Sequence, residues 1–343
     1  MPEWLIVVVA VVALVLVAVA IAILYARLAP SETLAHSVGL SLACAAVGML
    51  AWFACVPFFS IPNFADLTIP LGLLGGVAAL VATCAPRALG AGTVASLVFA
   101  ASWSLAVYVP VALATFVTGV AGIVPVDHGG SLALNVAAGA AALGVLVAPG
   151  RPANIATGIR VPRGLGSAAV VALVIGWVGW LVAAELAITP LSLDVIVNAL
   201  VAAAGGVAGW LAVQRIRHQT TTLAAVAAGL VSGLVAITAG APLVSPVAAA
   251  SFGVIAGGLA CILTLRRVQA SGRGQWFIVG THLVAAATGI VLLGLLATGT
   301  GFAFTGQIVF IQDQLLSTAA VASYSSVVAL LIWLLVSRLR RAA

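Results

Sequence analysis

The residues of this 343-residue chain that could do chemistry are the few polar ones inside or beside its long apolar runs. His282, Asn135 and Asn198 lie within such runs, Glu185 lies near the end of one, and Asp127 just precedes another. A polar group inside a membrane span is costly, so it usually lines a pathway or pairs with another group. An imidazole can hold or release a proton near neutral pH, whereas an amide only exchanges hydrogen bonds. The pattern therefore indicates either a pathway lined by these residues or their pairing with one another inside the bundle.

Membrane-spanning helices would have to position these residues. Each apolar run is close to the ~20 residues that cross a hydrocarbon core as a helix. None shows the two-residue alternation of a β-barrel strand. The sequence predicts an all-α polytopic membrane protein with eleven transmembrane helices, over residues 4–26, 36–57, 69–85, 92–117, 130–149, 165–187, 190–213, 222–241, 244–265, 276–298 and 314–337.

The charged residues predict how these helices are oriented. All thirteen positive side chains are arginines, and they fall only in every second gap between the apolar runs. The intervening gaps carry Asp66, Asp127, Glu185 with Asp194, and Asp313, without any arginine. Cytoplasmic loops of membrane proteins are enriched in positive residues. An odd number of spans then places the N-terminus outside the cell and the C-terminus in the cytoplasm.

Composition excludes several classes of function. With 64% apolar and 6% charged residues, the chain leaves no room for a separate soluble domain, and we expect a multi-pass protein of the cell (inner) membrane. The net charge of +6 comes from loop arginines and indicates lipid headgroups rather than nucleic acid. No Walker loop or zinc motif is present, and the four cysteines have no paired spacing. We therefore predict no cofactor, no metal site and no enzymatic activity.

Several stretches together resemble the Amt/Mep/Rh ammonium transporter family. The segment from Asp127 through Gly-Gly to Asn135 resembles the signature of the family's fifth helix, in which a pore histidine follows the Asp by eight residues. Other stretches also resemble family motifs in order and spacing; they are Tyr25-Ala-Arg27, Gly176-Trp-Val-Gly-Trp180, Gly229 to Thr238, and Gly280-Thr-His282. The likeness extends over nearly the whole chain.

The resemblance implies a fold, a substrate and an assembly. It implies a homotrimer in which each subunit is one transmembrane domain, with two inverted five-helix halves (roughly 4–149 and 165–298) and a peripheral eleventh helix (314–337). It further implies ammonium as the substrate. Ammonium would be recruited and deprotonated at an outer aromatic site, and neutral ammonia would pass through a narrow, histidine-lined pore. Family members bound by a cytoplasmic regulator have a longer C-terminal tail, so we expect no such binding here.

The chain departs from the family pattern at the pore. An ungapped count places Asn135 at the first pore-histidine position, whereas a count back from the helix end places Leu134 there. His282 is then the one remaining pore histidine. The third-helix gate residue corresponds to Gly72, which leaves Trp180 as the remaining gate residue. At the outer vestibule, Phe116 replaces a tryptophan, Ala184 replaces a serine next to Glu185, and Phe277 replaces the acidic residue before His282.

Each candidate residue also has a purely structural interpretation. His282 could be a buried histidine bonded to a backbone carbonyl, and Asn135 could join two helices. Glu185 could extend to the headgroups, Trp177 could belong to an interfacial belt or the packing, and Asp127 could cap a helix. The histidines near span ends, His36, His128 and His218, are expected to be solvated.

The leading hypothesis is an ammonium or ammonia channel of divergent type. One alternative is a non-conducting Amt-like protein that acts as a sensor or an interaction scaffold. The other is a pore for another small solute. Weaker proton coupling than in a pore with two histidines is expected, because an amide has no accessible protonated state near neutral pH.

Overall fold

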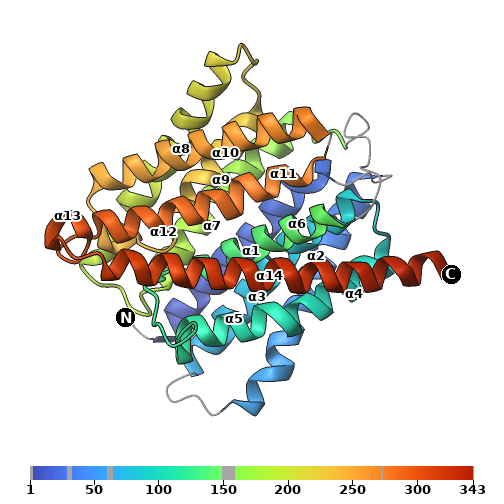
Figure 1. Ribbon diagram of the computed structural model, residues 1–343, viewed down its shortest axis with the longest axis horizontal. Coiled ribbons are helices and arrows are strands. Elements are labelled where there is room, and N and C mark those ends of the chain that lie inside the picture. The colour runs from blue at the N-terminus through green and yellow to red at the C-terminus, as the bar shows by residue number, and fades with distance from the viewer. Residues whose placement is uncertain (1–2, 29–32, 60–64, 149–158, 272, 343) are drawn as a thin grey trace.

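The computed structural model describes residues 3–28, 33–59, 65–148, 159–271 and 273–342. In this part of the chain all regular structure is helical, apart from one isolated bridge between Val120 and Ile123. Figure 1 shows the long helices packed side by side in one bundle. The main helices are α1 (Glu3–Tyr25), α2 (Leu34–Cys55), α3 (Ala65–Ala88), α4 (Thr93–Trp103), α5 (Val109–Leu113), α6 (Ala137–Val147), α7 (Arg163–Ala183), α8 (Leu191–Ile216), α9 (Leu223–Ile237), α10 (Pro246–Ser271), α11 (Gln275–Ile278), α12 (Ala285–Leu296), α13 (Phe302–Thr305) and α14 (Val309–Ala342).

Each of the eleven predicted runs coincides with helical structure. Within the described residues, nine helical segments are long and apolar enough to cross a membrane. The fifth and eighth runs form shorter apolar helices, Leu132–Val147 and Leu223–Ile237. A helix of 15 residues is only about 23 Å long, below the ~30 Å of a hydrocarbon core. The all-helical membrane fold is confirmed, whereas the count of eleven spans stays a prediction.

Two non-helical backbone segments pair with each other, one just before the first short helix begins and one just after the second ends. The N–H of His128 donates to the carbonyl of Ala239 at 3.0 Å, and the N–H of Gly129 donates to the carbonyl of Thr238 at 2.9 Å. Irregular backbone inside a membrane protein needs such internal partners, because lipid offers no hydrogen bonds. This pairing joins the start of the fifth apolar segment to the end of α9. Gly130 has a φ of +76°, which allows the chain to turn into the helix that follows.

Small residues bring three helices into close contact. A Cβ atom at Gly206 of α8 would collide with the carbonyl oxygen of Gly229 in α9, and one at Gly253 of α10 would collide with the carbonyl oxygen of Ala202 in α8. Contact of helix backbones at glycines is the usual way in which transmembrane helices pack without a hydrophobic driving force. The glycine pattern correctly predicted a tightly packed bundle.

The C-terminal helix α14 lies along one face of the bundle (Figure 1), where it contacts α4, α6 and α12. The Ser325 hydroxyl donates to the carbonyl of Ala137 at 2.6 Å, and the Ser326 hydroxyl donates to that of Ala140 at 3.0 Å. These bonds attach α14 to α6, directly behind the residues of the candidate site.

Candidate functional site

The centre of the candidate site is His282, which is fully buried and hydrogen-bonded at both ring nitrogens. Nδ1 lies 3.0 Å from Oδ1 of Asn135, and Nε2 lies 2.9 Å from the hydroxyl of Tyr25. An amide oxygen can only accept, so Nδ1 carries the proton and Nε2 accepts the tyrosine hydroxyl. The interpretation of His282 as a histidine bonded to a backbone carbonyl is therefore wrong. Both of its partners are side chains from other parts of the chain.

Asn135 and His282 both lie in π-helical turns, at Leu132–Val136 (η5) and Val279–Val284 (η8). Such turns are frequent at functional positions, since the extra residue changes the direction of the side chains. Asn135 is the residue that bonds His282, while the neighbouring Leu134 is a buried apolar side chain. The Nδ2 amide of Asn135 is buried and has no hydrogen-bond partner among the described residues. The site therefore holds one unused donor beside the imidazole.

Tyr25 is the member of this site that the sequence did not identify as a site residue. It lies at the end of α1, and its ring makes edge contacts with His282 (centroids 5.9 Å apart) and Phe277 (5.4 Å). The guanidinium of Arg27 lies over the Phe277 ring, with Cζ of Arg27 5.2 Å from the ring centroid. The signal in the sequence was a tyrosine two residues before an arginine at the end of an apolar run. It could not reveal that the hydroxyl reaches an imidazole on another helix.

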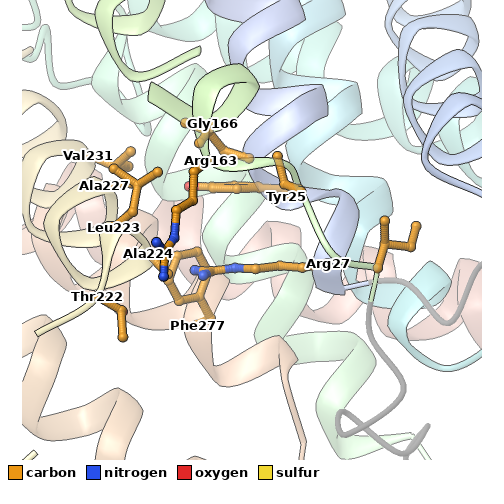
Figure 2. A pocket seen from close by; sticks show the side chains of 13 residues that line it. Tyr25, Arg27, Arg163, Gly166, Thr222, Leu223, Ala224, Ala227, Val231 and Phe277 are labelled. Atoms are coloured by element: carbon orange, nitrogen blue, oxygen red, sulfur yellow. The ribbon is translucent and has the colours of Figure 1, made fainter. Parts of the chain in front are cut away.

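A cavity of about 230 Å³ opens beyond Tyr25 and Phe277. Figure 2 shows Tyr25, Arg27 and Phe277 along one side of it and residues of α9 on the other. Arg163, the first residue of α7, also lines this cavity. We call this side of the bundle, with Arg27, Arg163, Gln219 and Gly274, the arginine end. Tyr25 and Phe277 separate His282 from the cavity.

Asp127 caps a helix at the opposite side of the bundle. Its two carboxylate oxygens accept the backbone N–H groups of Ser131 and Leu132, each at 2.7 Å. Burial raises the pKa of this carboxyl to about 6, against the lowering effect of these backbone donors. The capping role is the one that the structural interpretation predicted. We call the side of the bundle with Asp127, Glu185 and Asp313 the acidic end.

His128 was expected to be solvated, and this expectation is wrong. Its Nε2 lies 2.7 Å from the carbonyl of Leu181, and the residue is only partly exposed. Burial lowers its pKa, against the raising effects of the Leu181 carbonyl and of Glu185 nearby. The irregular segment between Asp127 and Gly130 folds back onto α9, and this carries the imidazole inward, which a position near a span end did not indicate.

Trp177 and Trp180 are anchored by hydrogen bonds to the two paired segments around Thr238 and Gly129. The indole N–H of Trp177 donates to the Thr238 hydroxyl at 3.0 Å, and that of Trp180 donates to the Gly129 carbonyl at 2.9 Å. Trp177 is only 1% exposed, which agrees with a packing role and not with an interfacial belt. Phe116 is half-buried and faces the backbone of Gly130.

Gly72, the position without the expected gate aromatic, is covered by aromatic side chains from α2. A Cβ atom at Gly72 would lie 2.8 Å from the Phe53 ring and 3.1 Å from the Trp52 ring. Phe53 and Trp52 therefore occupy the space next to Gly72. The sequence alone did not indicate that aromatic side chains of α2 lie beside Gly72.

Glu185 and Ala184 follow the last turn of α7 at the acidic end. One carboxylate oxygen of Glu185 accepts the Thr189 hydroxyl at 2.5 Å, while the other is buried and without a partner among the described residues. Ala184 is half-buried, and its N–H donates to the Trp180 carbonyl at 2.8 Å. Glu185 thus has an acceptor available beside the tryptophan pair.

The remaining polar candidates are structural. Asn198 of α8 donates to the carbonyls of Ala241 and Val244, at 2.9 and 2.7 Å, and so holds the turn after α9. Among the described residues, no group of three or more His, Cys, Asp or Glu could hold a metal ion. The arrangement joins Asn135, His282 and Tyr25 by hydrogen bonds inside the bundle, with the imidazole as the member that can exchange a proton.

The sequence matches one protein family and several of its curated members. The profile of the Ammonium Transporter Family matches residues 90–341. The chain is 28% identical over 265 residues to an ammonium transporter of Mycobacterium bovis, an alignment that covers 70% of this chain and 55% of that protein. It is also 28% identical over 261 residues to an ammonium transporter of Bacillus subtilis, covering 71% of this chain and 62% of that one. The chain thus spans little more than half the length of the mycobacterial relative.

Solved structures share the fold. A Mep2 variant from Candida albicans superposes with a TM-score of 0.84 at 20% identity, over 96% of this chain and 84% of that chain. A structure described as a sensor Amt protein superposes with a TM-score of 0.81 at 17% identity, over 99% of this chain and 93% of that chain. At these identities the likeness concerns the fold alone.

Proposed function

The chain belongs to the Ammonium Transporter Family, and we propose that it carries ammonium nitrogen across a membrane as neutral ammonia. The observation that carries this proposal is the chain of Tyr25, His282 and Asn135 inside the bundle, with one amide N–H left unpaired. That donor suits a solute with a lone pair. Ammonia has a lone pair, whereas ammonium has four donors and none.

The polarity of the site discriminates against the ion. Moving a bare cation into an apolar interior is costly unless a partner of opposite charge is present. Around His282 the partners are neutral side chains, and its single acceptor, Nε2, already receives the Tyr25 hydroxyl. Ammonium would find no free acceptor on this imidazole, whereas ammonia can accept from the Asn135 amide.

The acidic end has the groups that an incoming cation needs. Glu185 provides an unpartnered carboxylate oxygen, and the faces of Trp177 and Trp180 can attract a cation. We propose that ammonium arrives here, that one of its N–H bonds breaks, and that the proton passes to water at this end. Ammonia then proceeds toward Asn135 alone, so its passage is electrically silent unless a proton follows.

Tyr25 must move for ammonia to leave at the arginine end. Its hydroxyl occupies Nε2 of His282, and its ring stands between the imidazole and the cavity beside Phe277. A rotation of this side chain would open the outlet and free Nε2 at the same time. The described geometry then corresponds to a closed pore.

Reconstitution into proteoliposomes tests the proposal. An inward ammonium gradient should raise the pH of the lumen, measured with a trapped dye, with little current on a supported membrane. His282→Ala should reduce the rate about ten-fold or more, because the conduit loses its polar centre. His218→Ala, which removes an exposed histidine, is the matched control and should leave the rate unchanged. A rate that His282→Ala does not alter would contradict the assignment of this site.

Asn135→His sharpens the same test. It restores an imidazole opposite His282, and an imidazole can carry a proton where the amide cannot. The variant should therefore show a larger ammonium-evoked current than the wild type. An unchanged current, with the pH signal intact, would mean that position 135 does not limit proton movement.

A sensor that does not conduct is the second candidate, and the hydrogen bond between Tyr25 and His282 favours it. If this bond is permanent, the pore is blocked from the arginine end. A neighbour in fold is described as a sensor Amt protein. If the folded wild type shows no ammonium-driven pH change and the Tyr25→Phe variant does, the Tyr25 side chain acts as a closed gate. Silence in both proteins would favour the sensor.

We further propose eleven spans, with the arginine end in the cytoplasm, the acidic end outside, and a homotrimeric assembly. Single cysteines at positions 160 and 267 should react with an impermeant label only from the cytoplasmic side, and one at position 313 only from outside. The four native cysteines would first be replaced. Mass measurement of the detergent complex checks the trimer. The reversed labelling pattern would contradict the proposed orientation, and a monomeric mass would contradict the trimer.

A further inference from the structure

Two adjoining cavities lie at the arginine end. The cavity of about 230 Å³ beside Tyr25 shares three lining residues, Arg27, Ile159 and Phe277, with a second cavity of about 450 Å³. Their sizes together fall in the range of small-molecule sites. The proposed path of ammonia needs the first cavity only as an outlet past Tyr25, and this use does not account for the two arginines on its wall.

The first cavity brings two positive charges together. Arg27 and Arg163 both line it, and Figure 2 shows their guanidinium groups pointing toward one another beside the Phe277 ring. No carboxylate lines either cavity among the described residues, and neither arginine has an ion pair there. Two like charges that face each other repel, and the repulsion is removed when an anion lies between them.

The second cavity supplies an independent observation. Thr264 lines it, is only 7% exposed, and has a buried hydroxyl oxygen without a hydrogen-bond partner among the described residues. A buried hydroxyl normally has a partner, so the Thr264 side chain, which lines this cavity, has a donor and an acceptor that a polar group of a ligand could use. A Cβ at Gly280 would collide with this hydroxyl, so the glycine makes room for it. Two amides, Gln219 and Gln269, line the same cavity.

We propose that the paired cavities bind a phosphate-bearing anion. The guanidinium groups of Arg27 and Arg163 would hold the phosphate, because their planar forks match its oxygens. The Thr264 hydroxyl and the two amides would bond polar groups of the remainder, and Ile159 and Phe277 would pack against its apolar part. The phosphate belongs either to a soluble phosphate ester or to an anionic lipid headgroup. The site does not depend on whether the pore conducts.

Such an anion would also affect the outlet. It would lie against Phe277 and next to Tyr25, the two residues that separate His282 from the cavity. Its presence would hinder the rotation of Tyr25. Binding of the phosphate compound would therefore be coupled to opening of the arginine end.

Calorimetric titration of the full chain in neutral detergent tests the proposal, with inorganic phosphate and glycerol 3-phosphate as probes. Nanodiscs of phosphatidylcholine, with or without phosphatidylglycerol, test the lipid source through their effect on the thermal midpoint. Arg163→Gln is the principal variant. Arg160→Gln is its matched control, because this exposed arginine lies three residues earlier and lines neither cavity. Thr264→Val is a second variant that removes only an unpartnered hydroxyl.

The expected result is saturable binding of one probe class, about ten-fold weaker in Arg163→Gln, several-fold weaker in Thr264→Val, and unchanged in Arg160→Gln. Binding of the soluble probes identifies a phosphate ester. Stabilisation by phosphatidylglycerol alone, with the same dependence on Arg163, identifies a lipid headgroup. Equal weakening by Arg160→Gln, or no response to any probe, would overturn the proposal.

Discussion

The junction of the two short helices and the centre of the bundle differ in how their polar groups are paired. At the junction, Asp127 accepts two N–H groups at the start of the fifth apolar helix. Trp177 donates to the Thr238 hydroxyl, and Trp180 donates to the Gly129 carbonyl. At the centre, His282 is paired at both nitrogens, but the Asn135 amide keeps an unused donor. Paired groups hold a fold, whereas a buried unpaired group reduces stability and is retained where a ligand uses it. The comparison separates a scaffold from a site.

The pH dependence of Asp127 should give the largest effect on stability. Its folded pKa of about 6 lies above the ordinary value of 3.8. Between these values the folded state holds a proton that the unfolded state has lost, so stability falls as pH rises through this window. The total is up to about 3 kcal/mol. Thermal midpoints in detergent from pH 4 to 6.5 measure it, and Asp127→Asn should lack this component. Equal slopes in both proteins would mean that the carboxyl is not desolvated.

Removal of the cap should have the next largest effect. Asp127→Ala leaves the N–H groups of Ser131 and Leu132 without their acceptors, at a cost of about 2 kcal/mol at neutral pH. Asp194→Ala is the control, because this exposed aspartate in the first turn of α8 makes no side-chain hydrogen bond with the described residues. Comparable losses in the two variants would show that Asp127 acts only through its charge near a helix N-terminus.

A smaller loss is expected for Trp180→Phe. The phenyl ring keeps most of the apolar packing but removes the N–H that bonds the Gly129 carbonyl, which costs about 1 kcal/mol. Trp4→Phe, at a position that is 65% exposed, should have no measurable effect. Chemical denaturation of the detergent-solubilised protein compares the two. A Trp180→Phe protein as stable as the wild type would place this tryptophan with the site rather than with the scaffold.

The smallest change in stability is expected at the centre. Asn135→Leu removes one hydrogen bond to His282 and one buried unpaired donor, and the imidazole can switch tautomer to donate to Tyr25. The net effect should stay within about 0.5 kcal/mol, since the two contributions oppose each other. The same denaturation measurement applies. A loss as large as that of Asp127→Ala would mean that Asn135 belongs to the scaffold, and the comparison would fail.

Much of the fold could be read from local sequence features. Runs of apolar residues predicted helices at the observed positions, and glycines such as Gly206 and Gly253 predicted close packing. The eighth run was predicted to extend over residues 222–241, whereas α9 ends at Ile237, because the small residues that follow Thr238 do not interrupt the apolar pattern although they form turns. The role of Asp127 as a cap could be predicted because a cap is a local feature.

The sequence by itself determined the membrane class and the family, and it singled out His282 and Asn135 as candidates, since hydropathy and motif spacing are properties of short segments. Only the tertiary structure decided which atoms meet. Tyr25 reaches His282 across 257 positions, and Arg27 meets Arg163 in one cavity. Such contacts depend on the rotation of each helix about its axis, and a single π-helical turn changes that rotation without altering the apolar pattern.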